Sequence, residues 1–218
     1  MARSSATMTA DRGCRTPQQA RSRETRRRIL EAGVSCFEAH GYDNTTTAAI
    51  ARRAGVAVGT VYGYFGDKRA ILLELADRTS NEIADRIVAS LDPAAWREAD
   101  PGASVRTLID TLFHTRTFNP GMQRILWERY FKDPEFRGGL ERVERRIRAA
   151  MLNLFEALQA QGRLRIDDLP TATFVLYSAI EWIAARLMLG ASAVHIDLAV
   201  ATTSDMASRF LFGVRSDA

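Results

Sequence analysis

Polar side chains that can donate a hydrogen bond to an anion are concentrated between residues 47 and 68. They include two threonine hydroxyls, two tyrosine hydroxyls and one lysine ammonium, from Thr47, Thr60, Tyr62, Tyr64 and Lys68. Lys68 follows Asp67, a residue suited to cap a helix, and the free N–H groups at a helix N-terminus attract phosphate. Gly59 lacks a side chain, so the backbone there can come close to a phosphate group. These residue types predict binding of an anionic partner rather than catalysis.

Residue types that perform catalysis or bind metals show no recognisable grouping in this sequence. No motif joins a nucleophile, a base and an orienting group, and there is no glycine-rich phosphate loop. The histidines and cysteines are too widely spaced for a zinc motif, at His40, His114, His195, Cys14 and Cys36. We therefore expect no enzyme activity, no metal and no cofactor, and we expect Cys36 to be a core residue.

Basic residues are unevenly distributed along the 218 residues, whose formal net charge is +4. Residues 1–69 hold 12 lysines and arginines against 6 acidic residues, and the remaining 149 residues hold 18 against 20. This asymmetry indicates a polyanion partner for the first part of the chain only. Three arginines, residues 26–28, lie in the first turn of a predicted helix, where the helix dipole disfavours cations. They indicate either an external anion or a solvated basic face.

Almost every segment after residue 24 has the apolar spacing of a helix, and none alternates convincingly as a strand does. Gly41 is expected to end the first helix, Thr46 to cap the second, and Gly55 to form a tight turn after it. The expected elements are helices over residues 23–40, 47–54 and 57–64, and a long helix that starts at residue 67. Two short helices joined by a turn containing glycine fit the helix-turn-helix pattern.

Beyond residue 90, four pairs of a capping residue and a proline mark the starts of four helices. Proline suits the first helical position because its missing N–H would have no partner within the helix anyway. The pairs are Asp92-Pro93, Asp100-Pro101, Asn119-Pro120 and Asp133-Pro134. After the last pair, an apolar stripe from Phe136 to Leu158 predicts one long amphipathic helix that ends near Gly162.

Two further helices are expected over residues 170–189 and 194–212. The first is apolar nearly all round, so it must be covered on every side, and a domain this small can hardly do that within one chain. The second also has apolar residues on two sides. We infer that these two helices pair with their copies in a second subunit and form a four-helix interface.

No segment is expected to cross a membrane or to direct secretion. The longest apolar run, residues 174–189, is interrupted by Glu181 and Arg186, and it is shorter than the about 20 residues that a membrane span needs. The first 24 residues are polar and contain no apolar secretory region. We therefore expect a soluble, cytoplasmic protein.

The stretch over residues 26–75 resembles the N-terminal domain of the TetR family of bacterial repressors (TetR/AcrR-like). After an apolar first helix, the family's features occur in order at Gly41-Tyr42, Thr45-Thr46-Thr47, Ile50-Ala51, Ala54-Gly55-Val56, Gly59-Thr60-Val61-Tyr62, Tyr64-Phe65 and Lys68. The resemblance implies an all-α fold, in which an N-terminal three-helix helix-turn-helix domain is joined to a C-terminal helical ligand-binding and dimerisation domain. The implied units are a basic, flexible arm at residues 1–23, a DNA-binding domain at 24–68, and an effector-binding and dimerisation domain at 69–218.

The resemblance also implies how duplex DNA would be bound. The helix that begins near Ala57 would enter the major groove, while the helix before it braces the DNA backbone. Val61 and Phe65 would then face inward as core residues. The implied DNA-binding residues are Thr47, Ala57, Val58, Gly59, Thr60, Tyr62, Tyr64 and Lys68.

Three positions depart from the family pattern. Val58 stands where lysine is common, Gly63 where a long polar or aromatic residue is common, and Ala57 where a serine cap is common. Loss of the cap weakens the start of the helix by about 1 kcal/mol. Few side chains are then left to read base edges, namely Thr60, Tyr64 and Val58 through a thymine methyl group. We therefore expect backbone contacts and DNA shape to contribute more to recognition.

In this family the C-terminal domain usually holds a small apolar or amphipathic ligand, whose binding changes the spacing of the two DNA-binding heads. Large aromatic surfaces with a few polar groups suit such a pocket, although aromatic residues at helical spacing also suit a packed core. Glu181 lies inside an apolar helix, where it can pair with Arg186 or another subunit, or bind a cationic or hydroxylated ligand. The candidate ligand-binding residues are Phe113, Phe118, Met122, Trp127, Tyr130, Phe131, Phe155, Phe174, Tyr177 and Glu181.

Together, the residues and the resemblance predict a ligand-responsive transcriptional regulator. It would bind a palindromic operator as a homodimer, joined through its last two helices, and an unidentified small-molecule effector would release it. The family implies a repressor, since the residues themselves do not separate a repressor from an activator. Two alternatives stay open, an architectural DNA-binding dimer without a small-molecule effector and a repressor whose effector is a protein.

The arginine-rich N-terminal arm generates a first prediction. Arg12, Arg15, Arg21 and Arg23 could lie in the minor groove, whereas the competing interpretation is plain disorder without DNA contact. Deletion of residues 1–20 should weaken operator binding and lower its dependence on salt, because fewer phosphate counterions are released. A salt titration of operator affinity for both chains measures this. Unchanged affinity and an unchanged slope would rule the arm contact out.

Overall fold

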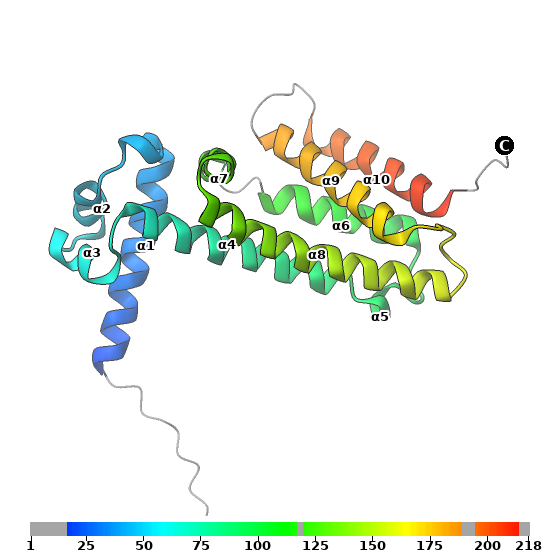
Figure 1. The fold of residues 1–218 in the computed structure, drawn as a ribbon, viewed down its shortest axis with the longest axis horizontal. Coiled ribbons are helices and arrows are strands. Elements are labelled where there is room, and N and C mark those ends of the chain that lie inside the picture. Colours follow the sequence, from blue (N-terminus) through cyan, green and yellow to red (C-terminus); the bar gives the residue numbers. More distant parts are fainter. Residues whose placement is uncertain (1–16, 117–119, 189–194, 214–218) are drawn as a thin grey trace, which may run out of the picture.

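The computed structural model describes residues 17–116, 120–188 and 195–213, which form helices and connecting turns without any strand (Figure 1). The first four helices are α1 (Pro17–Asn44), α2 (Thr47–Ala54), α3 (Val58–Tyr64) and α4 (Lys68–Ser90). The other six are α5 (Pro93–Trp96), α6 (Pro101–Arg116), α7 (Pro120–Lys132), α8 (Pro134–Ala160), α9 (Leu169–Met188) and α10 (Ile196–Phe212). The predicted all-α fold is confirmed.

The helix-turn-helix segment has the caps that its sequence predicts. Thr46 caps α2 by accepting a hydrogen bond from the Ala49 N–H at 3.1 Å. Gly55 ends α2 in the left-handed conformation, with a φ of 65° that a residue with a Cβ would adopt only under strain. This glycine therefore permits the tight turn between α2 and α3. At the predicted stop of the first helix, Gly41 has a φ of 74° and interrupts the helical geometry of α1.

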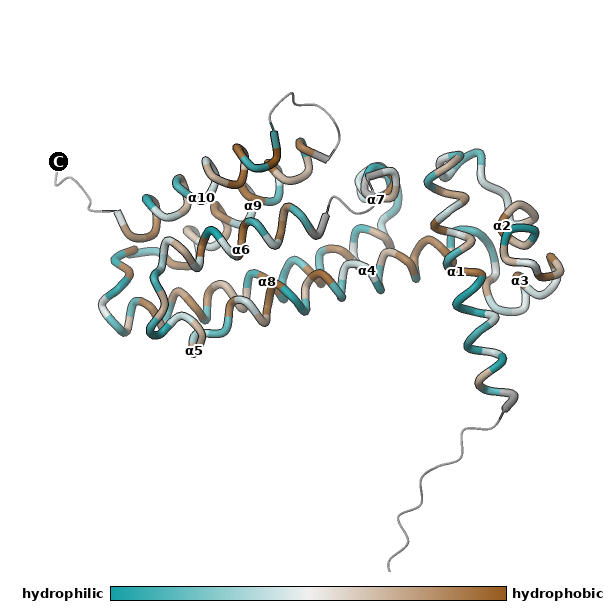
Figure 2. Tube along the Cα trace, turned by 180° about the vertical axis from the view of Figure 1, so that it is seen from behind, coloured by the Kyte–Doolittle hydropathy of each residue, from teal (hydrophilic) through white to brown (hydrophobic). Residues whose placement is uncertain are grey.

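The start of α1 differs from the sequence expectation. The helix begins at Pro17 rather than near Arg23, so residues that were expected in a flexible arm are helical. The added turns are held against α3, because the Tyr64 hydroxyl donates a hydrogen bond to the Ser22 hydroxyl oxygen at 3.0 Å. Figure 2 shows this part of α1 as largely hydrophilic, with its N-terminal end extending beyond α2 and α3. The absence of an apolar stripe there explains why periodicity did not reveal these turns.

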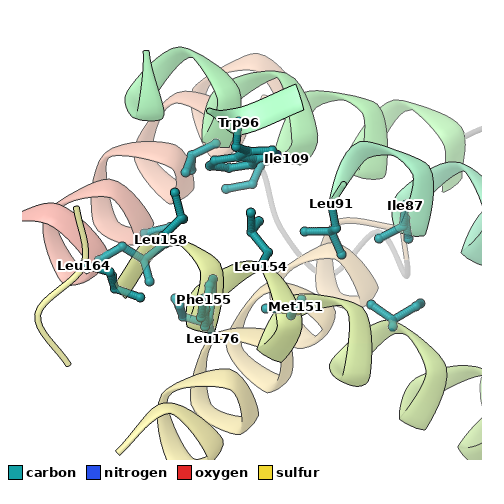
Figure 3. Close-up of a cluster of buried hydrophobic side chains, with 14 of the residues drawn as sticks. Ile87, Leu91, Trp96, Ile109, Met151, Leu154, Phe155, Leu158, Leu164 and Leu176 are labelled. Carbon is teal, nitrogen blue, oxygen red and sulfur yellow. The ribbon is translucent and has the colours of Figure 1, made fainter. Parts of the chain in front are cut away.

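The described residues form two hydrophobic cores, and α4 contributes to both. The first core is built around Phe37, Ile50 and Val61 of α1–α3, and it includes Ile71, Leu72, Leu75 and Ala76 of α4 and Met122, Ile125 and Leu126 of α7. The second core joins the far half of α4 to α5, α6, α8, α9 and α10 (Figure 3). In the first core α1 crosses α4 closely at Gly33, where an added Cβ would lie 2.8 Å from Cγ2 of Ile71.

The helices are arranged around the pair α4 and α8, which lie side by side (Figure 1). At one end of this pair α1–α3 form the helix-turn-helix segment, and at the other α6, α9 and α10 cover the second core. Helix α7 lies between these parts and contacts α1, α8 and α9. No helix in the described part of the chain is long and apolar enough to cross a membrane.

The proline pairs mark helix starts as predicted, because α5, α6, α7 and α8 begin at their four prolines. Asp92 accepts a hydrogen bond from the Ala94 N–H at 3.0 Å, and Asp100 accepts one from the Ala103 N–H at 2.7 Å. Asp133 caps α8 by accepting from the N–H groups of residues 135 and 136. Asn119, the fourth predicted cap, lies outside the described residues.

One ion pair fastens the start of α4 to the start of α8. Arg69 donates two hydrogen bonds to Asp133, from Nε at 2.7 Å and from Nη2 at 2.8 Å, and Nη2 also lies 2.8 Å from a Glu135 oxygen. The Arg69 guanidinium and the two backbone N–H groups of the cap lower the pKa of Asp133 to about 2. The same carboxylate therefore caps one helix and binds another.

This double role of Asp133 predicts a stability effect with a defined pH dependence. Asp133→Ala should lower the free energy of unfolding by about 1–2 kcal/mol, because it removes the helix cap as well as the ion pair. Asp133→Asn keeps an acceptor for the cap and removes only the charge. The charge stabilises the fold fully above the unfolded pKa of about 3.9, and this contribution disappears as the pH falls through about 2.

Urea unfolding followed by circular dichroism measures the effect. The stability difference between the wild-type chain and Asp133→Asn should be largest at neutral pH and should shrink between about pH 4 and pH 2. Glu135→Gln, on the exposed side of the same arginine, is the control and should change stability less. A difference for Asp133→Asn that does not vary with pH would contradict the assignment.

Candidate nucleic-acid interface and small-molecule pocket

Helix α3 presents one face to the core and the opposite face to solvent. Val61 and the following Phe65 are buried, as expected, and they fix how α3 is rotated on the first core. The solvent face carries Val58, Gly59 and Tyr62, and the Tyr62 side chain is 56% exposed. A hydroxyl on a rigid ring and a stretch of bare backbone are thus available to a partner.

Helix α3 begins without a side-chain cap, and its two glycines lie where a larger side chain would also fit. Ala57 stands at the N-cap without a side-chain hydrogen bond, as expected from its departure from the family pattern. A Cβ added at Gly59 or Gly63 would meet no atom within 4 Å. Thr47 and Thr60 are half-buried, at the first turns of α2 and α3. The glycines therefore leave open space on the outer face of α3.

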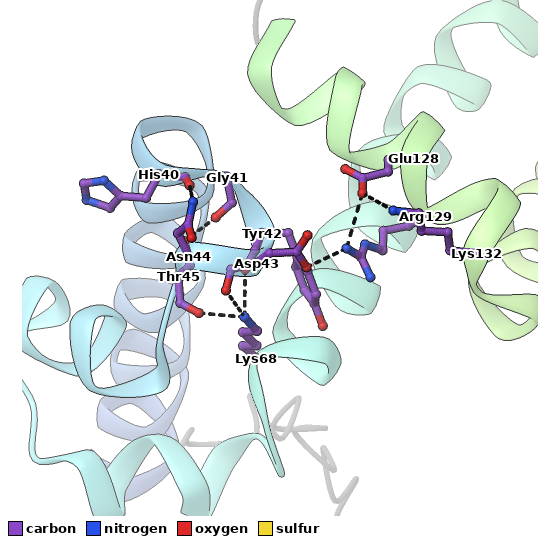
Figure 4. A network of polar contacts seen from close by, with 10 residues as sticks. All are labelled: His40, Gly41, Tyr42, Asp43, Asn44, Thr45, Lys68, Glu128, Arg129 and Lys132. Carbon is purple, nitrogen blue, oxygen red and sulfur yellow. Dashed lines mark hydrogen bonds and ion pairs between the residues drawn. The ribbon is translucent and has the colours of Figure 1, made fainter.

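Two predicted DNA-binding side chains have partners inside the protein. Tyr64 is half-buried, and its hydroxyl proton is donated to Ser22 rather than directed outward. The Lys68 ammonium donates to the backbone oxygens of Tyr42 at 2.8 Å, Asp43 at 3.0 Å and Thr45 at 2.8 Å (Figure 4). An ammonium has three N–H donors, so none is left for phosphate in this arrangement. In this arrangement the Lys68 side chain holds together the connection between α1 and α2, and its contact with DNA stays a prediction.

The three adjacent arginines of α1 also serve the fold. Because α1 begins at Pro17, they lie inside the helix rather than in its first turn. Arg26 pairs with Glu74, Arg27 pairs with Glu24 and Glu31, and Arg28 donates to the backbone oxygens of Ala54 and Gly55 at the end of α2. These internal partners remove the need for an external anion at this site.

Sequence reasoning missed two arginines that are better placed to contact a polyanion than the arginines at residues 26–28. Arg52 and Arg53 occupy the last turn of α2 and are exposed. None of the ion pairs within the described part of the chain involves either of them. Their only sequence signal was their position just before the turn residue Gly55, and the more conspicuous run of residues 26–28 obscured it.

A pocket opens among α4, α7, α8 and α9. It encloses about 880 Å³, counting the part open to solvent. Four of the predicted ligand-binding residues line it, namely Trp127, Tyr130, Tyr177 and Glu181. The remaining lining residues come from α4 and α8, with Leu126 of α7: Thr79, Ser80, Ile83, Leu126, Leu140, Val143, Glu144 and Ile147.

The other predicted ligand-binding residues lie elsewhere. Phe113 and Phe155 are buried in the second core, and Met122 is buried in the first. Phe131 and Phe174 are exposed by 68% and 51% of their surface. Phe118 lies outside the described residues. All of these residues are large apolar groups, and that property alone does not separate a core from a pocket.

The lining from α4 and α8 was not predicted, although part of it was visible in the sequence. Leu140, Val143 and Ile147 belong to the apolar stripe from Phe136 to Leu158, which predicts an amphipathic helix but does not indicate a pocket. Leu140 and Val143 are half-buried, because the pocket interrupts the packing of α8 against α4 at this level. A stripe on a helix shows which face is apolar, but not where its neighbour leaves a gap.

Helix α7 connects the pocket with the helix-turn-helix segment. One side of α7 carries Trp127 and Tyr130, which line the pocket. The other side carries Arg129, whose guanidinium carbon lies 4.1 Å from the Tyr42 ring centroid and whose Nη2 lies 2.9 Å from an Asp43 oxygen (Figure 4). Tyr42 and Asp43 are also the residues whose backbone binds Lys68. A displacement of α7 would therefore act directly on the connection between α1 and α2.

The last two helices expose large apolar side chains. On α9 Phe174 and Trp182 lie eight residues apart, which places them on the same side of the helix, and Val175 adjoins them. On α10 Leu198, Met206 and Phe210 are exposed at spacings of eight and four. Trp182 is 55% exposed, and its ring also contacts the Trp127 ring of the pocket wall, with centroids 6.1 Å apart. These two helices thus leave an apolar surface that the described part of their own chain does not cover.

Comparison with known proteins agrees with this architecture. The sequence model of the family described as bacterial regulatory proteins, tetR family, matches residues 29–75, from α1 into α4. Over 183 residues the chain is 28% identical to the HTH-type transcriptional repressor KstR of Mycobacterium tuberculosis, a match that covers 82% of this chain and 80% of that protein. The relatives found in this way are transcriptional regulators and not enzymes.

Two solved structures have the same fold at low sequence identity. A transcriptional regulator from Saccharomonospora viridis in complex with choline is 23% identical, with a TM-score of 0.73 over 87% of this chain and 98% of that one. The regulator FadR from Bacillus subtilis in complex with stearoyl-CoA is 18% identical, with a TM-score of 0.68 over 87% of this chain and all of that one. In its helix-turn-helix segment, over most of its length and in its fold, the chain is therefore similar to the tetR family of bacterial regulatory proteins.

Proposed function

We propose that this regulator is a homodimeric repressor that binds a palindromic operator and leaves it when a small molecule occupies the pocket among α4, α7, α8 and α9. The observation that carries the proposal is the position of α7, which lines the pocket with one side and contacts the base of the helix-turn-helix segment with the other. A ligand and a DNA operator would then act on opposite sides of one helix. The named repressor KstR, which matches over most of its length, supports the choice of a repressor.

DNA binding is assigned to the outer face of α3 and the exposed end of α2. In the proposed complex α3 lies in the major groove, with Val58, Thr60 and Tyr62 toward the bases or the adjacent backbone. Arg52 and Arg53 supply the positive charge that phosphate contact needs. The two open glycines bring the α3 backbone close to DNA. With so few base-reading side chains, backbone contacts and DNA shape carry a large share of recognition.

Dimerisation is assigned to the exposed apolar faces of α9 and α10. A second copy of the same two helices would bury Phe174, Trp182 and Phe210 in a two-fold, four-helix interface. Two copies would present their α3 helices about 34–36 Å apart, one turn of DNA, or at a multiple of that distance. This two-fold arrangement is what requires a palindromic operator.

Release follows from linkage between the two sites. The effector must bind the conformation with misaligned DNA-binding heads more tightly than the aligned one, by about 1–3 kcal/mol in typical cases. Entry of a ligand beside Trp127 and Tyr130 would displace α7, and the contacts of Arg129 with Tyr42 and Asp43 would transmit the displacement to α1. An architectural DNA-binding dimer without an effector would have no use for a pocket at this position.

Selection from random duplex DNA at physiological salt, followed by sequencing of the bound pool, tests the operator assignment. We expect enrichment of an inverted repeat, because a two-fold dimer contacts two equivalent half-sites. The variant Phe210→Glu, in which a charge is placed on the apolar face of α10, should sediment as a monomer and lose most of its affinity for the full repeat. Phe131→Glu, at a phenylalanine of α7 that is 68% exposed against 47% for Phe210, is the control for association. Binding without sequence enrichment that vanishes as salt rises would favour the architectural protein instead.

The open space around Gly59 predicts opposite effects on stability and on DNA affinity. Gly59→Ala should raise the free energy of unfolding by about 0.5–1 kcal/mol, since alanine is the better helix former and its Cβ meets no atom within the chain. The same Cβ should weaken operator binding, because the backbone can no longer approach the phosphate as closely. Gly138→Ala, in α8 and remote from α3, controls for helix propensity and should leave DNA affinity unchanged. Stabilisation with full operator affinity for Gly59→Ala would contradict the proposed contact.

A further inference from the structure

We propose that the pocket among α4, α7, α8 and α9 binds an organic cation with an apolar body. This inference rests on the proposed function, in that it specifies the effector of the same pocket. Two neighbours of the same fold are known with ligands of opposite character, choline in one and stearoyl-CoA in the other. Fold alone therefore does not determine the charge of the ligand, and the lining of this particular pocket has to decide it.

The charged groups that line the pocket are carboxylates. They are Glu144 of α8 and Glu181 of α9, and no lysine or arginine is among the described residues that line it. Arg148 lies 3.3 Å from Glu144 and neutralises part of its charge, but the guanidinium carbon of Arg148 lies 5.1 Å from the centroid of the exposed Phe174 ring, outside the lining. A carboxylate or phosphate ligand would be repelled by such a wall, whereas a cation would be attracted.

The charge pattern continues into a neighbouring hollow between α4 and α8. It shares Ser80, Leu140 and Val143 with the pocket, so the two spaces adjoin. The additional charged residues there are Asp77, Glu135 and Arg142. Carboxylates thus outnumber basic groups in both spaces. Glu135 is also paired with Arg69, which lies outside the lining of this hollow. A ligand long enough to extend from one space into the other would meet carboxylates in both.

Aromatic rings provide the second half of a cation site. Trp127, Tyr130 and Tyr177 line the same pocket, and the rings of Trp127 and Tyr130 lie 5.9 Å apart at an angle of 59°. Faces of such rings attract cations that have few hydrogen-bond donors, and Trp is the strongest of the three ring types. Rings set at an angle can contact a bulky cation from two sides. Aliphatic side chains of Ile83, Leu126, Val143 and Ile147 line the remaining wall and suit a hydrocarbon body.

A pair of probes that differ only in charge tests this inference. Tetraphenylphosphonium and tetraphenylborate have nearly the same size and shape but opposite charge, so the pocket's preference between them reports its electrostatics. Binding to the full-length chain is measured by isothermal titration calorimetry and by quenching of tryptophan fluorescence. We expect the phosphonium to bind at least about tenfold more tightly than the borate, given two carboxylates and three rings in the wall.

Variants connect the preference to the pocket. Glu181→Gln keeps the shape of the side chain and removes its charge, and it should weaken phosphonium binding by about tenfold. Tyr177→Leu removes a ring and should weaken it as well. Glu156→Gln removes an exposed carboxylate of α8 outside the pocket and should have no effect. Thermal unfolding of each variant shows that the fold is intact.

The possible outcomes separate this inference from the proposed function. Equal or tighter binding of the borate, or equal binding by Glu181→Gln and the wild-type chain, would overturn the cation assignment, although a small-molecule effector would still be allowed. Binding of neither probe would overturn it too. If the phosphonium binds with the expected variant pattern but does not release operator DNA, the cation site stands and the proposed release mechanism fails.

Discussion

The arrangement of the other helices depends on how α4 packs, because this single continuous helix contributes residues to both hydrophobic cores. Its first half fits against α1, where Gly33 allows close approach to Ile71, and its second half fits against α8. The bond between Arg69 and Asp133 fixes the register of α4 and α8 at the end near the helix-turn-helix segment. A helix shared in this way cannot change its tilt in one core without a change in the other. The helix-turn-helix segment and the part of the chain around the pocket are therefore mechanically joined even without a ligand.

Helix α7 adds a second, shorter connection between the same two parts. Its apolar residues Met122, Ile125 and Leu126 are buried in the first core, while its Trp127 and Tyr130 line the pocket. The cation–π contact and the ion pair of Arg129 then reach the turn after Gly41, which Lys68 holds by three hydrogen bonds. Burial raises the pKa of Tyr42, and the nearby positive charge of Arg129 offsets part of this rise. The tyrosine is therefore both packed and electrostatically coupled to α7. A polar network at this point is directional, and hence it is more sensitive to displacement than an apolar contact.

Much of the fold could be predicted from the sequence because the residues that begin and end its helices act on near neighbours in the chain. The caps Thr46 and Asp67, the turn at Gly55 and the aspartate–proline pairs act through bonds to residues two to four positions away, and each marked its helix correctly. The first turns of α1 were missed, since the Tyr64–Ser22 hydrogen bond that anchors them joins residues far apart in sequence. The partners of Lys68 and Arg28 are backbone oxygens, which carry no mark in the sequence at all.

The pocket was less predictable for a related reason. Aromatic residues indicated its surroundings, and Trp127, Tyr130, Tyr177 and Glu181 do line it. Whether a phenylalanine such as Phe155 packs in a core or faces a cavity depends on the fit between helices, however, and that fit is a property of the assembled bundle. The aliphatic wall from α4 and α8 could be identified only once both helices were in place.

The contact between Trp127 and Trp182 has a consequence for the concentration dependence of this regulator. The Trp127 ring belongs to the wall of the pocket, and the Trp182 ring belongs to the apolar surface of α9 and α10 that is proposed to contact a second subunit. Association of two chains would restrict Trp182, and through it the ring that a ligand must contact. Ligand affinity and subunit association would then be thermodynamically linked, so the apparent affinity for the ligand changes with the concentration of the chain itself. In a cell, the abundance of such a regulator would set its sensitivity as well as its occupancy of DNA.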